Sequence, residues 1–233
     1  MDLVFHIRRV VFLLSLFFCY SSMEAHSYSS IGLASMSSSR ESAQPLKIQQ
    51  GPLIVLDAGH GGKDEGAKVR QLQEKKIALL TTLYAKRYLE ELGYRVLLTR
   101  GKDVYVPLSK RVLIANKMKC AAFVSVHFNS AKNHLAQGLE VFYSSRGGTE
   151  RERSSRRLAN FLLHYVMDQT GAPSRGVKLG NQFHVIRETQ MASVIFEAGF
   201  MTNQEEWIKM REKPYLEKIA KGLAQGVDRY LKS

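Results

Sequence analysis

The stretch Leu53-Ile-Val-Leu-Asp-Ala-Gly-His-Gly-Gly-Lys-Asp-Glu-Gly66 decides how the rest of this chain can be arranged. Its first half is a continuous apolar run that predicts a strand buried on both faces, and the run stops at Asp57. The glycines that follow allow unusual backbone angles and let a ligand or an ion come close. His60 stands among them and is therefore a candidate metal ligand or acid–base group. The alternative is a turn that merely contains a histidine.

Segments with strand and helix character alternate downstream of this run. A helix is predicted from Glu74 to Gly93, with an apolar face formed by Ile77, Leu80, Tyr84, Tyr88 and Leu92, and residues 94–99 have strand character. Further strands are predicted at residues 121–126, 138–143, 183–186 and 192–196, with helices after Pro107, around residues 158–166 and after Pro214. This order predicts a single α/β domain, in which helices flank both faces of a mostly parallel twisted sheet of about six strands.

The N-terminal segment predicts export. Arg8 and Arg9 precede an apolar run, and small and polar residues follow, as in a signal peptide of residues 1–25 that is cleaved near Ala25. The run is short for a membrane span, but Met23 stands where a small residue is preferred, so an uncleaved anchor is the alternative. Residues 26–50 are rich in serine and predict a linker, which assigns residues 51–233 to the globular domain.

The composition restricts the partners. A formal net charge of +13 favours polyanions such as nucleic acid, anionic lipid or an acidic wall polymer. Export disfavours nucleic acid, so we expect no such partner. Cys120 is the only cysteine beyond the signal segment, which excludes an internal disulfide in the exported chain and predicts a buried apolar thiol.

Four residues suited to metal binding or proton transfer converge on one edge of the predicted sheet. Three apolar strands run into His60, His127 and Glu197, and Glu74 begins the helix that follows the loop at the same edge. Catalytic zinc takes three nitrogen or oxygen ligands and keeps a position for water, whose pKa it lowers to about 7. Two histidines and one glutamate can therefore bind zinc, and the other glutamate can act as the base.

Five segments carry a family resemblance, in an order and spacing that cover about residues 52–232. They are Asp57-Ala-Gly-His-Gly-Gly, Glu74-Lys-Lys, Ser125-Val-His-Phe-Asn129, Arg175-Gly-Val-Lys178 and Phe196-Glu-Ala-Gly-Phe-Met-Thr-Asn203. Together they resemble the zinc-dependent N-acetylmuramoyl-L-alanine amidases of the amidase-3 type. The departures at Ala58, Phe128 and His184 remove no residue that the family uses as a ligand.

The resemblance implies that His60, Glu74 and His127 bind Zn²⁺ and that Glu197 is the catalytic general base and acid. Residues 51–233 would then be a zinc amidase domain. It would hydrolyse the amide between N-acetylmuramic acid and L-alanine of the peptidoglycan stem peptide, in cell-wall remodelling or cell division. Another zinc peptidase or deacetylase acting on wall material is the alternative in the same chemistry. A non-catalytic, basic envelope-binding protein is the alternative in a different class.

The same resemblance implies a partner and a location. We expect an exported, periplasmic monomer that acts on peptidoglycan, its fragments or its precursors and contacts the membrane only through an uncleaved signal segment. Cell-division members of the family carry an inserted helix that blocks the zinc. Residues 144–174 have room for one helix and little more, so we expect no autoinhibitory helix.

Several other polar residues have two interpretations each. Asp57 either orients a metal ligand or caps its own loop. The arginines of residues 146–157 either surround a solvated helix N-terminus or contact a polyanion. We expect His184 to be structural, like His134 and His164, with contact to the substrate as its alternative.

Overall fold

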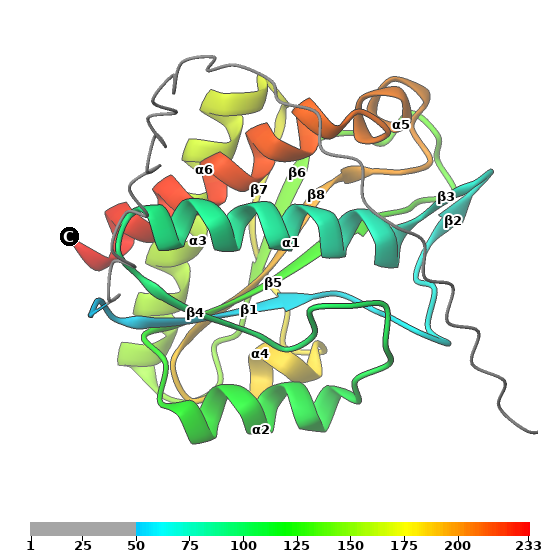
Figure 1. Ribbon diagram of the computed structural model, residues 1–233. Coiled ribbons are helices and arrows are strands. Elements are labelled where there is room, and N and C mark those ends of the chain that lie inside the picture. The colour runs from blue at the N-terminus through cyan, green and yellow to red at the C-terminus, as the bar shows by residue number, and fades with distance from the viewer. Residues whose placement is uncertain (1–49) are drawn as a thin grey trace, which may run out of the picture. The chain divides into compact units, whose positions relative to one another are not determined.

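A single sheet organises the residues that the computed structural model describes, which are residues 50–233. The predicted signal peptide and all of the linker except Gln50 lie outside this range. The sheet has six strands in the order β4-β1-β5-β8-β6-β7 (Figure 1). In that order the strands are Arg95–Leu98, Leu53–Ala58, Ala122–Asn129, Ala192–Phe200, Leu139–Tyr143 and Ser174–Leu179. β6 is antiparallel to β8 and the other pairs are parallel, which confirms the predicted mostly parallel sheet.

Helices cover both faces of this sheet, as predicted (Figure 1). One face packs against α1 (Glu74–Glu91), α3 (Thr149–Thr170) and α6 (Lys213–Leu231). The other face packs against α2 (Leu108–Met118) and the short α4 (His184–Glu188), around a smaller apolar cluster that includes Cys120. α5 (Gln204–Met210) precedes α6, and a small hairpin of β2 (Lys68–Val69) and β3 (Leu72–Gln73) leads into α1. No helix within residues 50–233 combines the length and the apolar character that crossing a membrane requires.

One predicted strand was wrong and one strand was missed in the C-terminal part of the sheet. Residues 183–186 were predicted as a strand, but residue 184 begins α4, and the backbone N–H of Arg187 donates to the carbonyl of Phe183 (3.0 Å). A short apolar run does not distinguish a strand from a buried helical turn. The sheet position beside β6 belongs instead to β7, an edge strand whose partly exposed, basic residues hide the strand signal.

The predicted apolar face of α1 is only partly correct. Tyr84 and Tyr88 are half-buried and Leu92 is 49% exposed, whereas Ala85 and Leu89 are fully buried. The face that α1 turns to the sheet and to α6 combines Ile77 and Leu89 with small side chains such as Ala78 and Ala85, so the two tyrosines and Leu92 lie at its margin.

The charged stretch before α3 divides into a buried and an exposed part. Arg151 is only 8% exposed, and its Nε donates to the carbonyl of Met191 (3.2 Å), so this arginine is not available to a polyanion. Arg153 is exposed and pairs with Glu150 at 3.2 Å, as expected for a solvated helix N-terminus.

The register of the central strands brings the predicted site residues to one edge. Asp57 pairs with Ser125, and His127 pairs with Glu197 across β5 and β8. β5 continues to Asn129 and β8 to Phe200, so His127 and Glu197 lie on the strands rather than just beyond them.

Candidate metal centre

The loop after β1 turns His60 toward the neighbouring strand β5. His60 has a backbone φ of 60°, a left-handed angle that is uncommon for a residue other than glycine. The His127 ring fills the space that a side chain at position 59 would need. A Cβ atom on Gly59 would lie 2.3 Å from His127 Cε1. The glycine that the sequence places before His60 therefore permits direct contact between this loop and the second histidine.

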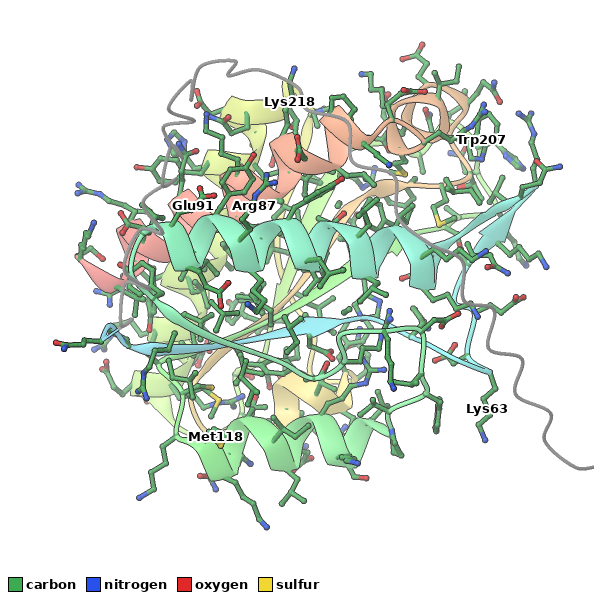
Figure 2. The ribbon with its side chains drawn as sticks, in the orientation of Figure 1. Lys63, Arg87, Glu91, Met118, Trp207 and Lys218 are labelled. Carbon is green, nitrogen blue, oxygen red and sulfur yellow. The ribbon has the colours of Figure 1, made fainter. Side chains whose placement is uncertain are left out.

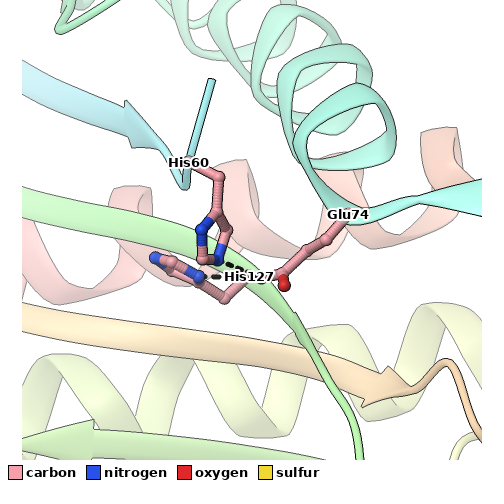
Figure 3. Close-up of side chains that lie close together, drawn as sticks. All are labelled: His60, Glu74 and His127. Carbon is pink, nitrogen blue, oxygen red and sulfur yellow. Dashed lines mark hydrogen bonds and ion pairs between the residues drawn. The ribbon is translucent and has the colours of Figure 1, made fainter. Parts of the chain in front are cut away.

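Three predicted residues meet at one point from three different elements. Their potential ligand atoms all lie within 4.8 Å of one another. Glu74 Oε1 is 3.0 Å from His60 Nε2 and 2.9 Å from His127 Nδ1 (Figure 3). Glu74 reaches this point because α1 begins with it, immediately after the β2–β3 hairpin. The structure therefore brings together His60, Glu74 and His127, as the sequence predicts.

Hydrogen bonds to residues outside the cluster fix the orientation of His60 and Glu74. Asp64 Oδ1 lies 2.9 Å from His60 Nδ1, which leaves Nε2 to face the cluster. Glu74 Oε2 accepts from the backbone N–H of Ala67 (2.8 Å), and Glu74 Oε1 accepts from that of Phe128 (3.2 Å). Two imidazoles and one carboxylate are the donor set that a catalytic zinc ion takes, and two of the three groups, His60 and Glu74, have such outer partners. The residues present therefore fit zinc.

The charges of the three groups are strongly coupled. Burial alone would raise the pKa of Glu74, but its hydrogen bonds to both histidines hold that pKa well below the usual range. Burial alone would lower the pKa of His127, but the hydrogen bond to Glu74 and the charge of Glu74 raise it to about 9. The ionised carboxylate of Glu74 thus favours a positively charged group beside it. A metal cation that binds there competes with protons for the imidazole nitrogens.

Glu197 lies close to these three residues but forms no hydrogen bond with them. It lines a cavity of about 360 Å³ together with them, and its Oε2 atom is buried without a partner among the described residues. Burial raises the pKa of Glu197 to about 7, with the negative charges of Glu74 and Glu140 adding to this effect and His127 opposing it. A carboxyl group with this pKa can accept and return a proton near neutral pH.

Asp57 stabilises the histidine loop rather than a ligand side chain. Its Oδ1 accepts from Arg111 Nη1 (2.6 Å) and its Oδ2 from Ser125 Oγ (2.7 Å). Arg111 in turn donates to the carbonyls of Ala58 and His60, both at 2.7 Å. Of the two interpretations of Asp57, anchoring of the loop is the one that these contacts support.

Sequence reasoning missed Arg111 and Asp64. Asp64 stands four residues after His60, and this short spacing in a glycine-rich loop was a usable signal. Arg111 lies 51 residues from His60 and has no such signal, because it reaches the loop only through the packing of α2 on the sheet.

Replacing Arg111 with leucine is expected to lower the free energy of unfolding by about 3–5 kcal/mol, because Asp57 becomes an unpaired buried charge. The Asp57 and Arg111 side chains are only 1% and 3% exposed. Urea denaturation of the metal-free protein measures the change. The control is Arg153→Leu, which removes an ion pair whose side chains are 72% and 81% exposed and which we expect to contribute less than about 1 kcal/mol. Equal effects of the two substitutions would contradict the assignment.

The other histidines among residues 50–233 lie outside the cluster. His184 lines another cavity beside the cluster and approaches Arg187 at 3.5 Å, so its contact with the substrate stays a prediction. His134 Nδ1 lies 3.0 Å from the carbonyl of Thr202, and His164 packs edge-on against Tyr165, as structural histidines do.

Comparison with known proteins supports the chemistry of this site. The sequence profile of the family described as N-acetylmuramoyl-L-alanine amidase matches residues 54–229. The catalytic domain of CwlV, an N-acetylmuramoyl-L-alanine amidase from Bacillus (Paenibacillus) polymyxa var. colistinus, is similar in structure. It is 35% identical with a TM-score of 0.72, and the similarity covers 78% of this chain and 98% of that one.

Relatives from Bacillus subtilis (strain 168) are similar over most of the chain. The uncharacterized protein YqiI is 34% identical over 190 residues, which are 82% of this chain and 88% of YqiI. The N-acetylmuramoyl-L-alanine amidase LytC is 31% identical over 180 residues, which are 77% of this chain but only 36% of LytC. Since the family profile extends from β1 through nearly all of α6, this chain belongs to the N-acetylmuramoyl-L-alanine amidase family.

Proposed function

We propose that this protein is an exported zinc hydrolase that cleaves the amide bond between N-acetylmuramic acid and the L-alanine of peptidoglycan stem peptides. The observation that carries the proposal is the arrangement of His60, Glu74 and His127 beside the unpaired carboxyl group of Glu197. The matched family and the similar structure of CwlV are both described as N-acetylmuramoyl-L-alanine amidase, which supports the choice of bond.

Each residue has a defined part in this proposal. His60, Glu74 and His127 would hold the zinc ion, which when bound supplies a Lewis acid and lowers the pKa of a water molecule. Glu197 removes the proton of the attacking water as the water oxygen bonds to the lactyl carbonyl carbon. Glu197 then returns a proton to the alanine nitrogen as the carbon–nitrogen bond breaks. The products are a lactyl carboxylate and a free amino terminus on the stem peptide.

Digestion of purified peptidoglycan tests the proposed bond directly. We expect mass spectrometry to detect intact stem peptides that begin with L-alanine, together with glycan strands that keep their acetyl groups. Peptides cut internally would identify a peptidase, and loss of acetyl groups would identify a deacetylase. Either result would contradict the proposed specificity.

The location and assembly state form part of the same proposal. We propose that the protein acts in the cell envelope, in the periplasm, and as a monomer, with peptidoglycan as its partner. The relatives named as cell-wall amidases support action outside the cytoplasm. Cell fractionation and light scattering of the purified protein would test these assignments.

The purified domain is expected to cleave peptidoglycan without an activator protein. Residues 144–173 contain one helix, α3, and its buried residues Leu158, Leu162 and Val166 belong to the main core. None of the residues that line the two cavities at the cluster comes from α3, so this helix does not cover the proposed zinc ligands. Turnover by zinc-loaded protein alone measures the prediction. A zinc-loaded enzyme that becomes active only after a second envelope protein is added would contradict it.

A further inference from the structure

We propose that Arg175 and Lys178 of β7 bind a carboxylate of the stem peptide, so that the peptide lies on the Glu197 side of the metal centre and the muramyl group lies on the opposite side. This inference rests on the proposed function and adds the orientation of the substrate. Both residues come from the Arg175-Gly-Val-Lys178 segment, to which the proposed reaction assigns no role.

Two cavities adjoin the metal centre. His60, His127, Phe183 and Ile195 line both of them. The first cavity, of about 310 Å³, has an apolar part formed by Tyr105, Val106, Leu108 and Val185 and a polar part formed by Asp57, Asp64, Arg111 and His184. The second cavity, of about 360 Å³, contains Glu197 together with the polar residues Asn129 and Ser130.

The position of Glu197 decides which part of the substrate enters which cavity. A general acid has to lie within hydrogen-bond reach of the atom that it protonates. In amide hydrolysis this atom is the leaving nitrogen, which belongs to the L-alanine of the stem peptide. Glu197 lines only the second cavity, so the peptide extends into that cavity. The muramyl group, with its lactyl methyl and acetamido groups, then faces the first cavity, which offers both apolar and polar side chains.

A polar chain connects the second cavity to β7. The amide nitrogen of Asn129 donates to Glu140 Oε2 (3.1 Å), and Glu140 is the register partner of Glu197 across β6 and β8. Glu140 Oε1 accepts from Lys178 Nζ (2.7 Å) and from Arg175 Nε. Both cationic side chains are 39% exposed, so they are accessible from the solvent, and Glu140 links them to Asn129 of the second cavity.

Arg175 presents an unused hydrogen-bonding face. Its Nε contacts Glu140 and its guanidinium group lies 5.0 Å from the centre of the Phe200 ring, which together fix its orientation. Its two terminal nitrogens have no hydrogen-bond partner among residues 50–233. The other nearby carboxylate, Glu206, already accepts from the backbone N–H groups of Gly138 and Phe200. An oriented guanidinium with two free nitrogens matches a carboxylate in a bidentate arrangement.

The stem peptide offers a carboxylate close to the scissile bond. In many cell walls the residue after L-alanine is a D-glutamate linked through its side chain, so its α-carboxylate is free, whereas in others this group is an amide. A site built by Arg175 and Lys178 discriminates between these two forms, because only the carboxylate supplies charge-assisted hydrogen bonds.

The test compares two soluble muramyl peptides that differ only in this carboxylate and its amide. We expect Arg175→Gln to raise KM for the free acid by about 10-fold or more, the scale of a lost hydrogen bond to a charged group, and to leave KM for the amide and both kcat values nearly unchanged. Lys178→Met is expected to act in the same direction. Calorimetric titration of the released peptide, as the acid and as the amide, gives the same comparison without turnover.

The matched control is Arg87→Gln on α1. Arg87 is also a partly exposed arginine with an acidic partner, Glu217 at 3.1 Å, and it lies over an aromatic ring, that of Tyr88. Figure 2 shows Arg87 beside Glu91 on α1, and its partner Glu217 belongs to α6. We expect this substitution to change KM for neither substrate.

Two failures have different meanings. If Arg175→Gln and Lys178→Met raise KM equally for the acid and the amide, or change only the melting temperature, these residues only neutralise Glu140 and the inference is wrong. If the wild-type protein releases no peptide beginning with L-alanine from either substrate, the proposed function fails instead.

Discussion

Replacing Glu197 with glutamine is expected to lower kcat by a factor of about 10²–10⁴, the usual contribution of a general acid–base group, and to leave the zinc content unchanged. Glutamine has nearly the same volume but cannot accept a proton. Glu197 Oε2 has no hydrogen-bond partner in the described chain, so the substitution breaks no contact of that atom. The pKa of about 7 that burial gives to Glu197 is the property that the glutamine removes.

The measurement combines turnover of a soluble muramyl peptide with the zinc content of the same sample. Glu150→Gln is a suitable control because the Glu150 side chain is 81% exposed on α3 and lies outside both cavities. Normal activity in Glu197→Gln would remove this residue from the mechanism. Loss of zinc in that variant would instead make Glu197 a metal ligand.

Replacing Glu74 with glutamine is expected to abolish turnover and to weaken zinc binding by more than about 100-fold. Loss of a residue that only contacts a metal ligand weakens metal binding by roughly 10–100-fold, and loss of a ligand costs more. Glu74 Oε1 lies within 3.0 Å of a nitrogen of both histidines, so its charge is central to the cluster. Competition with a chromophoric chelator measures the affinity. A second readout is the melting temperature, because zinc that binds only the folded protein raises it and the variant loses this increase.

The comparison variant for the zinc experiment is Asp64→Asn. Asp64 contacts His60 Nδ1 at 2.9 Å and is not itself one of the three clustered groups. We expect its replacement to weaken zinc binding by about 10–100-fold and to leave measurable activity at saturating zinc. If Glu74→Gln bound zinc as tightly as the wild type, Glu74 would not be a ligand. If Asp64→Asn were the more damaging of the two, the ligand assignment would have to change.

Much of the fold could be predicted because it depends on local burial. The uninterrupted apolar run before Asp57 predicts a strand covered on both faces, and β1 is such a strand. The alternation of strands and helices predicts a sheet with a layer of helices on each face. The short segments are different: residues 183–186 form a helical turn although their apolar content resembles that of a strand. A short run of apolar residues predicts that the segment is buried, but it does not predict whether the backbone is helical or extended.

The sequence by itself determined that His60, Glu74, His127 and Glu197 gather at one edge, because three of them lie near or just beyond the carboxyl ends of strands, and these ends share an edge in a parallel sheet. Only the tertiary structure decided how that edge is supported: by Arg111 under the histidine loop, and by Glu140 between Glu197 and the cations of β7. The physical reason is that local periodicity is produced by neighbours along the chain. Hydrogen bonds between buried polar groups on separate elements leave no such pattern, since they form only after the helices and strands have packed.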